Sequence, residues 1–319
     1  MSIAWVIGAG GVLGSALCRA LQGQGRVLFE PQRRFNWLVP ALLGEQFALS
    51  VTEFARLAAS ADRWEIYWAA GVGTMGSLPE QLNTETYALR ALLQFIAREP
   101  ALNETPSAVA FASSAGAIYA GSRDYVITEH SESAPTTEYA RVKLLQEGMI
   151  RKFAATGTDS KVLIARLSTL YGLGQSRGKP QGLISHIARS ILKNLPVKIY
   201  VPLDTIRDYI AADDAASSMV AGISAASDEQ PIRTTIIASE NPVTIAEIIA
   251  TFKRVTRRMP RIVMATDSLG THYPRRVFFK SVASENATRP RKTSLLVGIA
   301  GIMAGERISH MRGWRVQGE

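Results

Sequence analysis

Short apolar runs alternate with segments of helical spacing along most of the 319-residue chain. The first run, 3–7, ends at a glycine-rich turn, after which Leu13, Leu17 and Leu21 recur on one helix face. Further apolar runs of strand length lie at 26–30, 65–70, 107–113 and 233–237. Helical patterns separate them, at about 79–98, 136–156, 181–192, 211–223 and 244–255. This alternation predicts an α/β fold, with a doubly wound parallel sheet covered by helices on both faces.

The first turn carries Gly8, Gly11 and Gly14, with Gly10 as a further glycine. Glycine lets the backbone approach a ligand closely, and the free N–H groups at the start of the next helix favour an anion. We therefore expect a dinucleotide pyrophosphate here, in a Rossmann-type fold. A plain strand-to-helix turn would show the same glycines. A signal peptide is a second alternative, but the stretch 2–18 lacks a basic leader and its glycines would interrupt an apolar helix.

Composition narrows the class of protein. With 47% hydrophobic residues, a chain of this length can bury the core of one large α/β unit or of two associated domains. Cys18 is the single cysteine and is expected to pack as a small apolar side chain, which favours a reducing, cytoplasmic setting. The late apolar run 295–304 is about half as long as a spanning helix, so stable membrane insertion is not predicted.

The net charge of +9 comes from the C-terminal part, where residues 251–319 hold 14 Lys and Arg against 4 Asp and Glu. A nucleotide diphosphate, an anionic membrane surface or nucleic acid could use this charge, and a solvated basic face is the alternative. No helix-turn-helix, zinc-finger or aromatic stacking motif accompanies it, so nucleic acid is not an expected partner. The four histidines show no metal-ligand spacing, and no metal is expected.

Glu30 ends the second predicted strand, where a dinucleotide fold places the group that binds the adenosine ribose. Its carboxylate would accept a hydrogen bond from the ribose 2′-hydroxyl and repel a 2′-phosphate, which favours NAD over NADP. Arg33 and Arg34 lie close by, and guanidinium groups are the usual readers of that phosphate. The sequence predicts NAD as the cofactor and keeps NADP as the alternative.

Tyr139 and Lys143 are four residues apart in a predicted helix and therefore share one of its faces. A nearby ammonium favours the ionised form of a phenol, which makes tyrosine a better base. Such a pair alone is common on protein surfaces. Here it follows a glycine-rich first turn and a strand that ends in Ser113 and Ser114, so the joint pattern indicates a catalytic site.

At this point the chain resembles the extended short-chain dehydrogenase/reductases, in the NAD-dependent epimerase/dehydratase branch that acts on nucleotide sugars. The resemblance runs from Ile3 to about Met219. Its marks are Gly8-x-x-Gly11-x-x-Gly14, Asn83, Ser113-Ser114, Tyr119, Tyr139-x-x-x-Lys143 and the stretches 166–172 and 207–214. These motifs are specific for the family and do not identify one sugar.

The resemblance implies catalytic roles for Tyr139 as the proton-transferring phenol, Lys143 as its partner and Ser114 as the hydroxyl that orients the substrate. Ser113 is the alternative, because one residue more than usual separates Ser114 from Tyr119. Substrate contacts are implied for Ser114, for Thr169, where many epimerases have asparagine, and for Arg207, which would bind the diphosphate. The acidic residue expected after the third strand, near 48–50, is missing. The positions implied to line the cofactor are Gly8, Gly11, Val12, Leu13, Gly14, Glu30, Ala69, Ala70, Gly71, Asn83, Tyr139 and Lys143.

The resemblance also implies two parts: an NAD-binding domain at 1–168, to which the chain returns at about 208–238, and a smaller, discontinuous substrate lobe within 169–319. The lobe would consist mainly of 169–207 and 239–319, which places the basic C-terminal segment beside the cleft.

The implied function is that of an NAD-dependent nucleotide-sugar epimerase acting through a transient keto-sugar. A keto-sugar or carbonyl reductase is the nearest alternative, and a dinucleotide-binding regulator without turnover is a third. A 4,6-dehydratase is disfavoured, because Ala115, Gly116 and Ala117 supply no acid or base after the serine.

A homodimer is implied as well, assembled through helices near 80–98 and 136–156. The apolar side chains expected to extend beyond those needed against the sheet are Ala88, Leu92, Phe95, Leu144 and Leu145.

Overall fold

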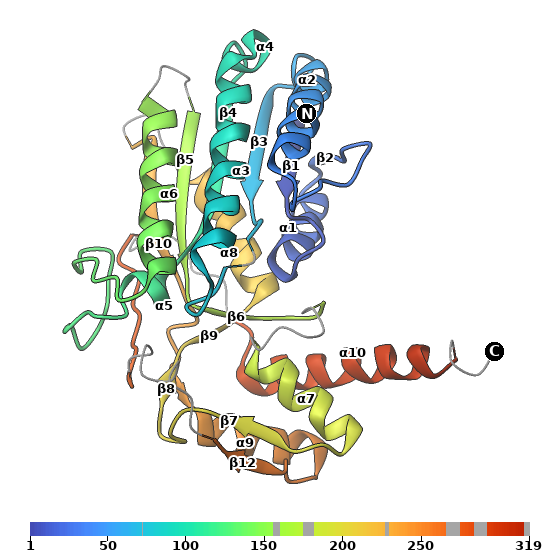
Figure 1. Cartoon of the computed structure of the whole chain (residues 1–319), viewed down its shortest axis with the longest axis vertical. Coiled ribbons are helices and arrows are strands. Elements are labelled where there is room, and N and C mark those ends of the chain that lie inside the picture. Colours follow the sequence, from blue (N-terminus) through green and yellow to red (C-terminus); the bar gives the residue numbers. More distant parts are fainter. Residues whose placement is uncertain are drawn as a thin grey trace.

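A parallel sheet of six strands forms the centre of the computed structural model, in the order β10-β5-β4-β3-β1-β2 (Figure 1). Because every pair is parallel, the carboxyl ends of all six strands lie at one edge. The strands are β1 Ser2–Ile7, β2 Val27–Phe29, β3 Arg63–Trp68, β4 Ser107–Ser114, β5 Ser160–Leu167 and β10 Ile232–Ile237. The structure describes residues 1–71, 73–155, 160–174, 182–226, 230–265, 275–283 and 292–315.

Helices cover both faces of this sheet, and strand alternation gives each face its own core. On one face the aromatic side chains gather: Trp5 packs with Phe29 and Phe54 at ring-centroid distances of 5.1 and 5.4 Å, under α2, α3 and α6. On the other face alanines of the strands let α1 and α8 approach closely. The predicted Rossmann-type fold is thereby confirmed. The helices are α1 Val12–Gly23, α2 Pro40–Ala58, α3 Pro79–Arg98, α6 Glu138–Ala155 and α8 Ala212–Ser224, with short α4 Pro100–Asn103 and α5 Ala115–Ile118.

A second, smaller core lies beyond the carboxyl edge of the sheet (Figure 1). Isoleucines of three helices, α7, α9 and α10, pack there with Val197 and Phe252. These segments come from both sides of β10 in the sequence, so this core is discontinuous. The domain bounds at 168 and 169 stay a prediction. The elements are β6 Thr169–Tyr171, α7 Leu183–Lys193, β7 Val197–Ile199, β8 Ile206–Arg207, β9 Tyr209–Ala211, β11 Val243–Thr244, α9 Ile245–Thr256, β12 Ile262–Met264 and α10 Leu295–Arg315.

A local sequence signal explains where α9 begins. Thr244 and Glu247 form a capping box at the start of α9: the Glu247 N–H donates to Thr244 Oγ1 at 3.1 Å, and the Thr244 N–H donates to Glu247 Oε2 at 2.6 Å. These bonds hold the pKa of Glu247 below its usual value.

Within the described residues, no helix combines the length and apolar content that a bilayer span requires.

Two expectations need correction. Residues 48–50 lie inside α2, which runs directly from the β2 side to β3, so no strand end exists there to carry an acidic residue. Ala88 and Leu92 are 0% and 1% exposed and belong to the core under α3, because α3 packs between α2 and α6. They are therefore not available as surface contacts, whereas Leu145 is 53% exposed.

Candidate functional site

The turn between β1 and α1 requires glycine at two positions for reasons of backbone packing. Gly8 has φ +89°, and a Cβ on Gly14 would lie 2.0 Å from the Gly8 carbonyl oxygen. A Cβ on Gly8 would lie 2.7 Å from the Ala70 backbone nitrogen at the end of β3. The Gly11 N–H donates to the Gly8 carbonyl at 2.9 Å, which closes the turn. The start of α1 thus sits against the ends of β1 and β3.

This helix start fits a dinucleotide pyrophosphate. Gly11 is the N-cap of α1 without a side-chain cap, and the first turn, which begins with Val12 and Leu13, contains no acidic residue. Its backbone N–H groups and positive dipole end therefore suit an anion. A Cβ on Gly10 would meet nothing within 4 Å, so the turn is open on that side.

Glu30 lies directly after β2 and is exposed. Its negative charge reaches α1: burial raises the pKa of the Cys18 thiol, and Glu30 raises it further. Arg33 and Arg34 are also exposed. The structure therefore places the carboxylate beside α1, and its part in selecting NAD stays a prediction.

Tyr139 and Lys143 lie on one face of α6, as their spacing predicts. Lys143 Nζ is 5.8 Å from the centroid of the Tyr139 ring and 5.2 Å from that of Phe111 on β4. Lys143 is 5% exposed and donates to Gln146 Oε1 at 3.0 Å. Burial lowers the pKa of Lys143, and the negative charges of Glu85 and Glu147 oppose that shift. A half-buried phenol thus lies next to a shielded lysine at the carboxyl edge of the sheet.

The two serines at the end of β4 have different surroundings. Ser113 is 4% exposed and donates to Glu147 Oε1 at 2.7 Å. Ser114 is half-buried at the N-cap of α5, and its side chain makes no capping bond. Because Ser113 is bonded to Glu147, Ser114 is the better candidate for a substrate contact.

Behind this pair lies a buried charged network that the sequence did not reveal. Arg166 on β5 donates to Glu147 through Nε at 2.9 Å and through Nη2 at 2.8 Å. Arg166 Nη1 also donates to the Tyr119 hydroxyl, and its guanidinium lies 5.1 Å from that ring. Burial raises the pKa of Tyr119, and Arg166 opposes this. Glu147 lies one helical turn after Lys143, a spacing that could have indicated its place on the same buried face.

Among the short strands outside the central sheet, the pairing of β6 with β9 places Thr169 opposite Tyr209. Thr169 is exposed, and its N–H donates to the Asp208 carbonyl at 3.1 Å. Arg207 is half-buried on β8, and its Nη1 donates to the Ile206 carbonyl at 2.8 Å. Burial raises the pKa of Tyr209 to about 12, against the influence of Arg207. The structure thus places Thr169 on β6 opposite Tyr209 of the 207–214 motif, two residues after Arg207 on β8.

The residues expected after β3 and on α3 divide into two groups. Ala69 continues the ladder, since its N–H donates to the Ile7 carbonyl at 2.9 Å, and Ala70 and Gly71 follow at the carboxyl edge. Asn83, however, is exposed on α3. Glu85, two residues later on α3, is half-buried and accepts a hydrogen bond from the Gly73 N–H.

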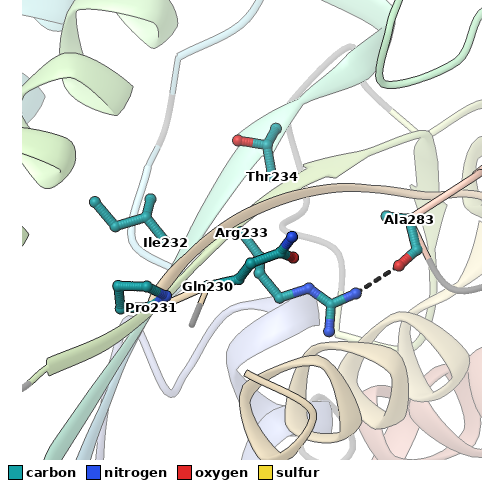
Figure 2. A pocket seen from close by; sticks show the side chains of 6 residues that line it. All are labelled: Gln230, Pro231, Ile232, Arg233, Thr234 and Ala283. Carbon is teal, nitrogen blue, oxygen red and sulfur yellow. Dashed lines mark hydrogen bonds between the residues drawn. The ribbon is translucent and has the colours of Figure 1, made fainter. Parts of the chain in front are cut away.

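A hollow elsewhere on the surface is not part of this site. Figure 2 shows it at the amino end of β10, where the Arg233 guanidinium donates to the Ala283 carbonyl. The glycine turn and Tyr139 lie at the opposite, carboxyl edge of the sheet. Its other lining residues are Gln230, Pro231, Ile232 and Thr234. Within the described residues, no three His, Cys, Asp or Glu side chains gather as metal ligands would.

Comparisons with known proteins place these features in a family. Residues 4–237 match the NAD dependent epimerase/dehydratase family. A dTDP-4-dehydro-6-deoxyglucose reductase of Escherichia coli is 28% identical over 145 residues, which are 46% of this chain and 44% of the relative. A dTDP-L-rhamnose 4-epimerase of Burkholderia thailandensis is 30% identical over 94 residues, which are 29% of this chain and 26% of the relative. The chain thus spans less than half the length of these two relatives.

Among solved structures, that of MoeE5 in complex with UDP-glucuronic acid and NAD superimposes with a TM-score of 0.78 and 21% identity, over 97% of this chain and 100% of the other. This likeness supports the Rossmann-type fold. From the match over residues 4–237, the chain belongs to the NAD dependent epimerase/dehydratase family.

Proposed function

We propose that this protein is an NAD-dependent nucleotide-sugar epimerase that acts through a transient keto-sugar. The observation that carries the proposal is the Tyr139–Lys143 pair, in which a buried lysine lies 5.8 Å from the phenol ring at the carboxyl edge of the sheet. Ligands of open parallel sheets bind at that edge. A tyrosine beside a fixed cation is suited to take a proton from a sugar hydroxyl.

NAD would be held by the glycine turn and the uncapped start of α1, with Glu30 on the adenosine ribose and Lys143 on the nicotinamide ribose. When bound, NAD would accept a hydride from the sugar and return it. The implied contacts of Ala69, Ala70, Gly71 and Asn83 belong to the same proposal, and Asn83 is exposed on α3.

In the first half of the reaction Tyr139 accepts the proton of the reacting hydroxyl, and the Lys143 ammonium stabilises the phenolate. Ser114 donates a hydrogen bond that orients the sugar. Arg207 and Thr169 hold the nucleotide diphosphate while the keto-sugar turns about its link to it. In the second half Tyr139 returns the proton to the carbonyl oxygen of the turned sugar, which then carries the inverted configuration.

A keto-sugar reductase would need the same three side chains, and one of the two relatives is named as a reductase. The difference lies in the fate of the hydride. An epimerase regains the hydride that it removed, whereas a reductase consumes reduced cofactor at every turnover.

The test uses UDP- and dTDP-sugars deuterated at the reacting carbon, incubated with purified protein and no added reduced cofactor. We expect inverted product that keeps its label. Label in free NADH, or turnover that requires stoichiometric NADPH, would establish the reductase instead.

Tyr139→Phe should lower kcat by about 10²–10⁴-fold with little loss of cofactor binding. If Tyr139→Phe turns over at the wild-type rate, the proposed mechanism is wrong.

We also propose a cytoplasmic homodimer formed through α3 and α6. Leu145 is 53% exposed and Tyr87 40% exposed on these helices, and Phe95 and Leu144 are partly buried. Light scattering at micromolar concentration tests this: Leu145→Glu should yield a monomeric mass. A monomeric wild-type mass would remove the proposal.

A further inference from the structure

Glu85 places a carboxylate beside the catalytic pair, although no motif includes it. It lies on α3 and turns inward to the segment after β3, where it accepts a hydrogen bond from the Gly73 N–H. A Cβ on Gly73 would lie 3.1 Å from Glu85 Oε1 and also 3.1 Å from Cδ2 of Tyr139. The carboxylate and the phenol ring therefore converge on the same glycine.

The same carboxylate faces Lys143. Its negative charge is the larger of two influences that raise the pKa of Lys143 against the effect of burial; the other is Glu147. These two carboxylates are not equivalent, because both oxygens of Glu147 accept hydrogen bonds from Arg166. Glu147 is thus already paired with Arg166, and Glu85 is the main source of negative charge that acts on Lys143.

Neutral polar groups also lie near Lys143. Its ammonium donates to Gln146, whose amide donates to Thr86 Oγ1 at 3.4 Å, and the Thr86 hydroxyl donates to the Leu82 carbonyl at 3.0 Å. From β4, only the ring of Phe111 faces the ammonium among the described contacts. α3 is therefore linked to Lys143 in two ways: Thr86 accepts a hydrogen bond from Gln146, which accepts one from Lys143, and the charge of Glu85 acts on the ammonium.

We propose that Glu85 is a positioning residue whose negative charge sets the pH range over which the Tyr139–Lys143 pair exchanges a proton with the substrate. The inference rests on the proposed function of that pair. In such a pair the first proton leaves the phenol and the second leaves the ammonium, so turnover rises and then falls with pH. Removing a nearby negative charge makes both losses easier, and both limbs of the profile move to lower pH.

The test compares the pH dependence of kcat/KM of the wild type with that of Glu85→Gln, which keeps an oxygen that can accept from the Gly73 N–H. We expect both limbs to shift downward by about 0.5–1 pH unit, as a unit charge at short range in a partly screened site produces. Glu80→Gln is the matched control: it removes the same charge from the exposed first turn of α3 and should shift neither limb.

A second readout does not depend on turnover. The tyrosinate absorbance assigned to Tyr139, taken as wild type minus Tyr139→Phe, should titrate at lower pH in the Glu85→Gln background. If Glu85→Gln does not fold, Glu85→Asp is measured in its place. Aspartate is one methylene shorter, so its charge lies farther from the Tyr139–Lys143 pair, and both limbs of the pH profile should lie at lower pH than in the wild type.

The inference would be overturned if, in the folded Glu85→Gln variant, the limbs of the kcat/KM profile and the tyrosinate titration of Tyr139 stayed at their wild-type pH values. That result is distinct from failure of the proposed function, which an active Tyr139→Phe enzyme would reveal.

Discussion

The buried ion pair between Glu147 and Arg166 should stabilise the fold strongly, and Glu147→Ala tests this. The carboxylate is 3% exposed and accepts two bonds from Arg166, at 2.9 and 2.8 Å, and one from Ser113 at 2.7 Å. Its removal leaves a guanidinium that is only 10% exposed without these acceptors. Breaking a buried pair on one side costs about 3–5 kcal/mol, so we expect a loss of that size.

The assay is urea unfolding followed by near- and far-UV circular dichroism, whose coincident transitions justify a two-state free energy. Glu138→Ala is the control on the same helix. Its partner Arg141 lies at 3.2 Å, and both side chains are more than half exposed, so that pair should contribute at most about 0.5 kcal/mol. The double variant Glu147→Leu with Arg166→Met should recover most of the loss, because the guanidinium that Glu147→Ala leaves buried without its carboxylate is then removed as well. A loss below about 1 kcal/mol for Glu147→Ala would refute this reasoning.

Three further substitutions test the glycine turn, the choice of cofactor and the packing of α10. Gly14→Ala should abolish cofactor binding in calorimetric titration, because its Cβ would lie 2.0 Å from the Gly8 carbonyl oxygen and force the turn open; unchanged affinity would show that the turn is not the site. Glu30→Ala should narrow the gap between the affinities for NAD and NADP by removing a charge-assisted bond of roughly 1.5–3 kcal/mol, and a wild type that already prefers NADP would contradict this. Gly298→Ala should lower the melting temperature, because a Cβ there would lie 2.0 Å from the hydroxyl of the buried Tyr171; an unchanged melting curve would disprove that contact.

The fold was predictable where the determining pattern is local. Short apolar runs predict β1 and β4, and the glycine turn predicts the start of α1. The capping-box residues Thr244 and Glu247 predict the start of α9. The part that could not be predicted depends on distant partners. Residues 48–50 carry no signal that separates a strand end from the middle of α2, because helix α2 is fixed by its packing on α3 and on the aromatic core.

The site divides in the same way. Tyr139 and Lys143 are one helical turn apart, so their proximity follows from the sequence. The choice between Ser113 and Ser114 does not, because it depends on a bond from Ser113 to Glu147 on another element. Glu85 was missed for the same reason: only the contact with Gly73, which lies on a different segment, turns it inward.

The two carboxylates near Lys143 differ in what they stabilise. Glu147 is bound on both oxygens by Arg166, so its charge is largely balanced within the core, and its loss should appear in the free energy of unfolding. Glu85 accepts from a backbone N–H at the edge where substrate is expected, and its charge acts on Lys143. Replacing Glu147 should therefore destabilise the protein, whereas replacing Glu85 should move the pH profile with a smaller cost in stability. Two carboxylates on neighbouring helices thus have separable effects, because Glu147 has Arg166 as its buried counter-ion, whereas the charge of Glu85 acts on Lys143.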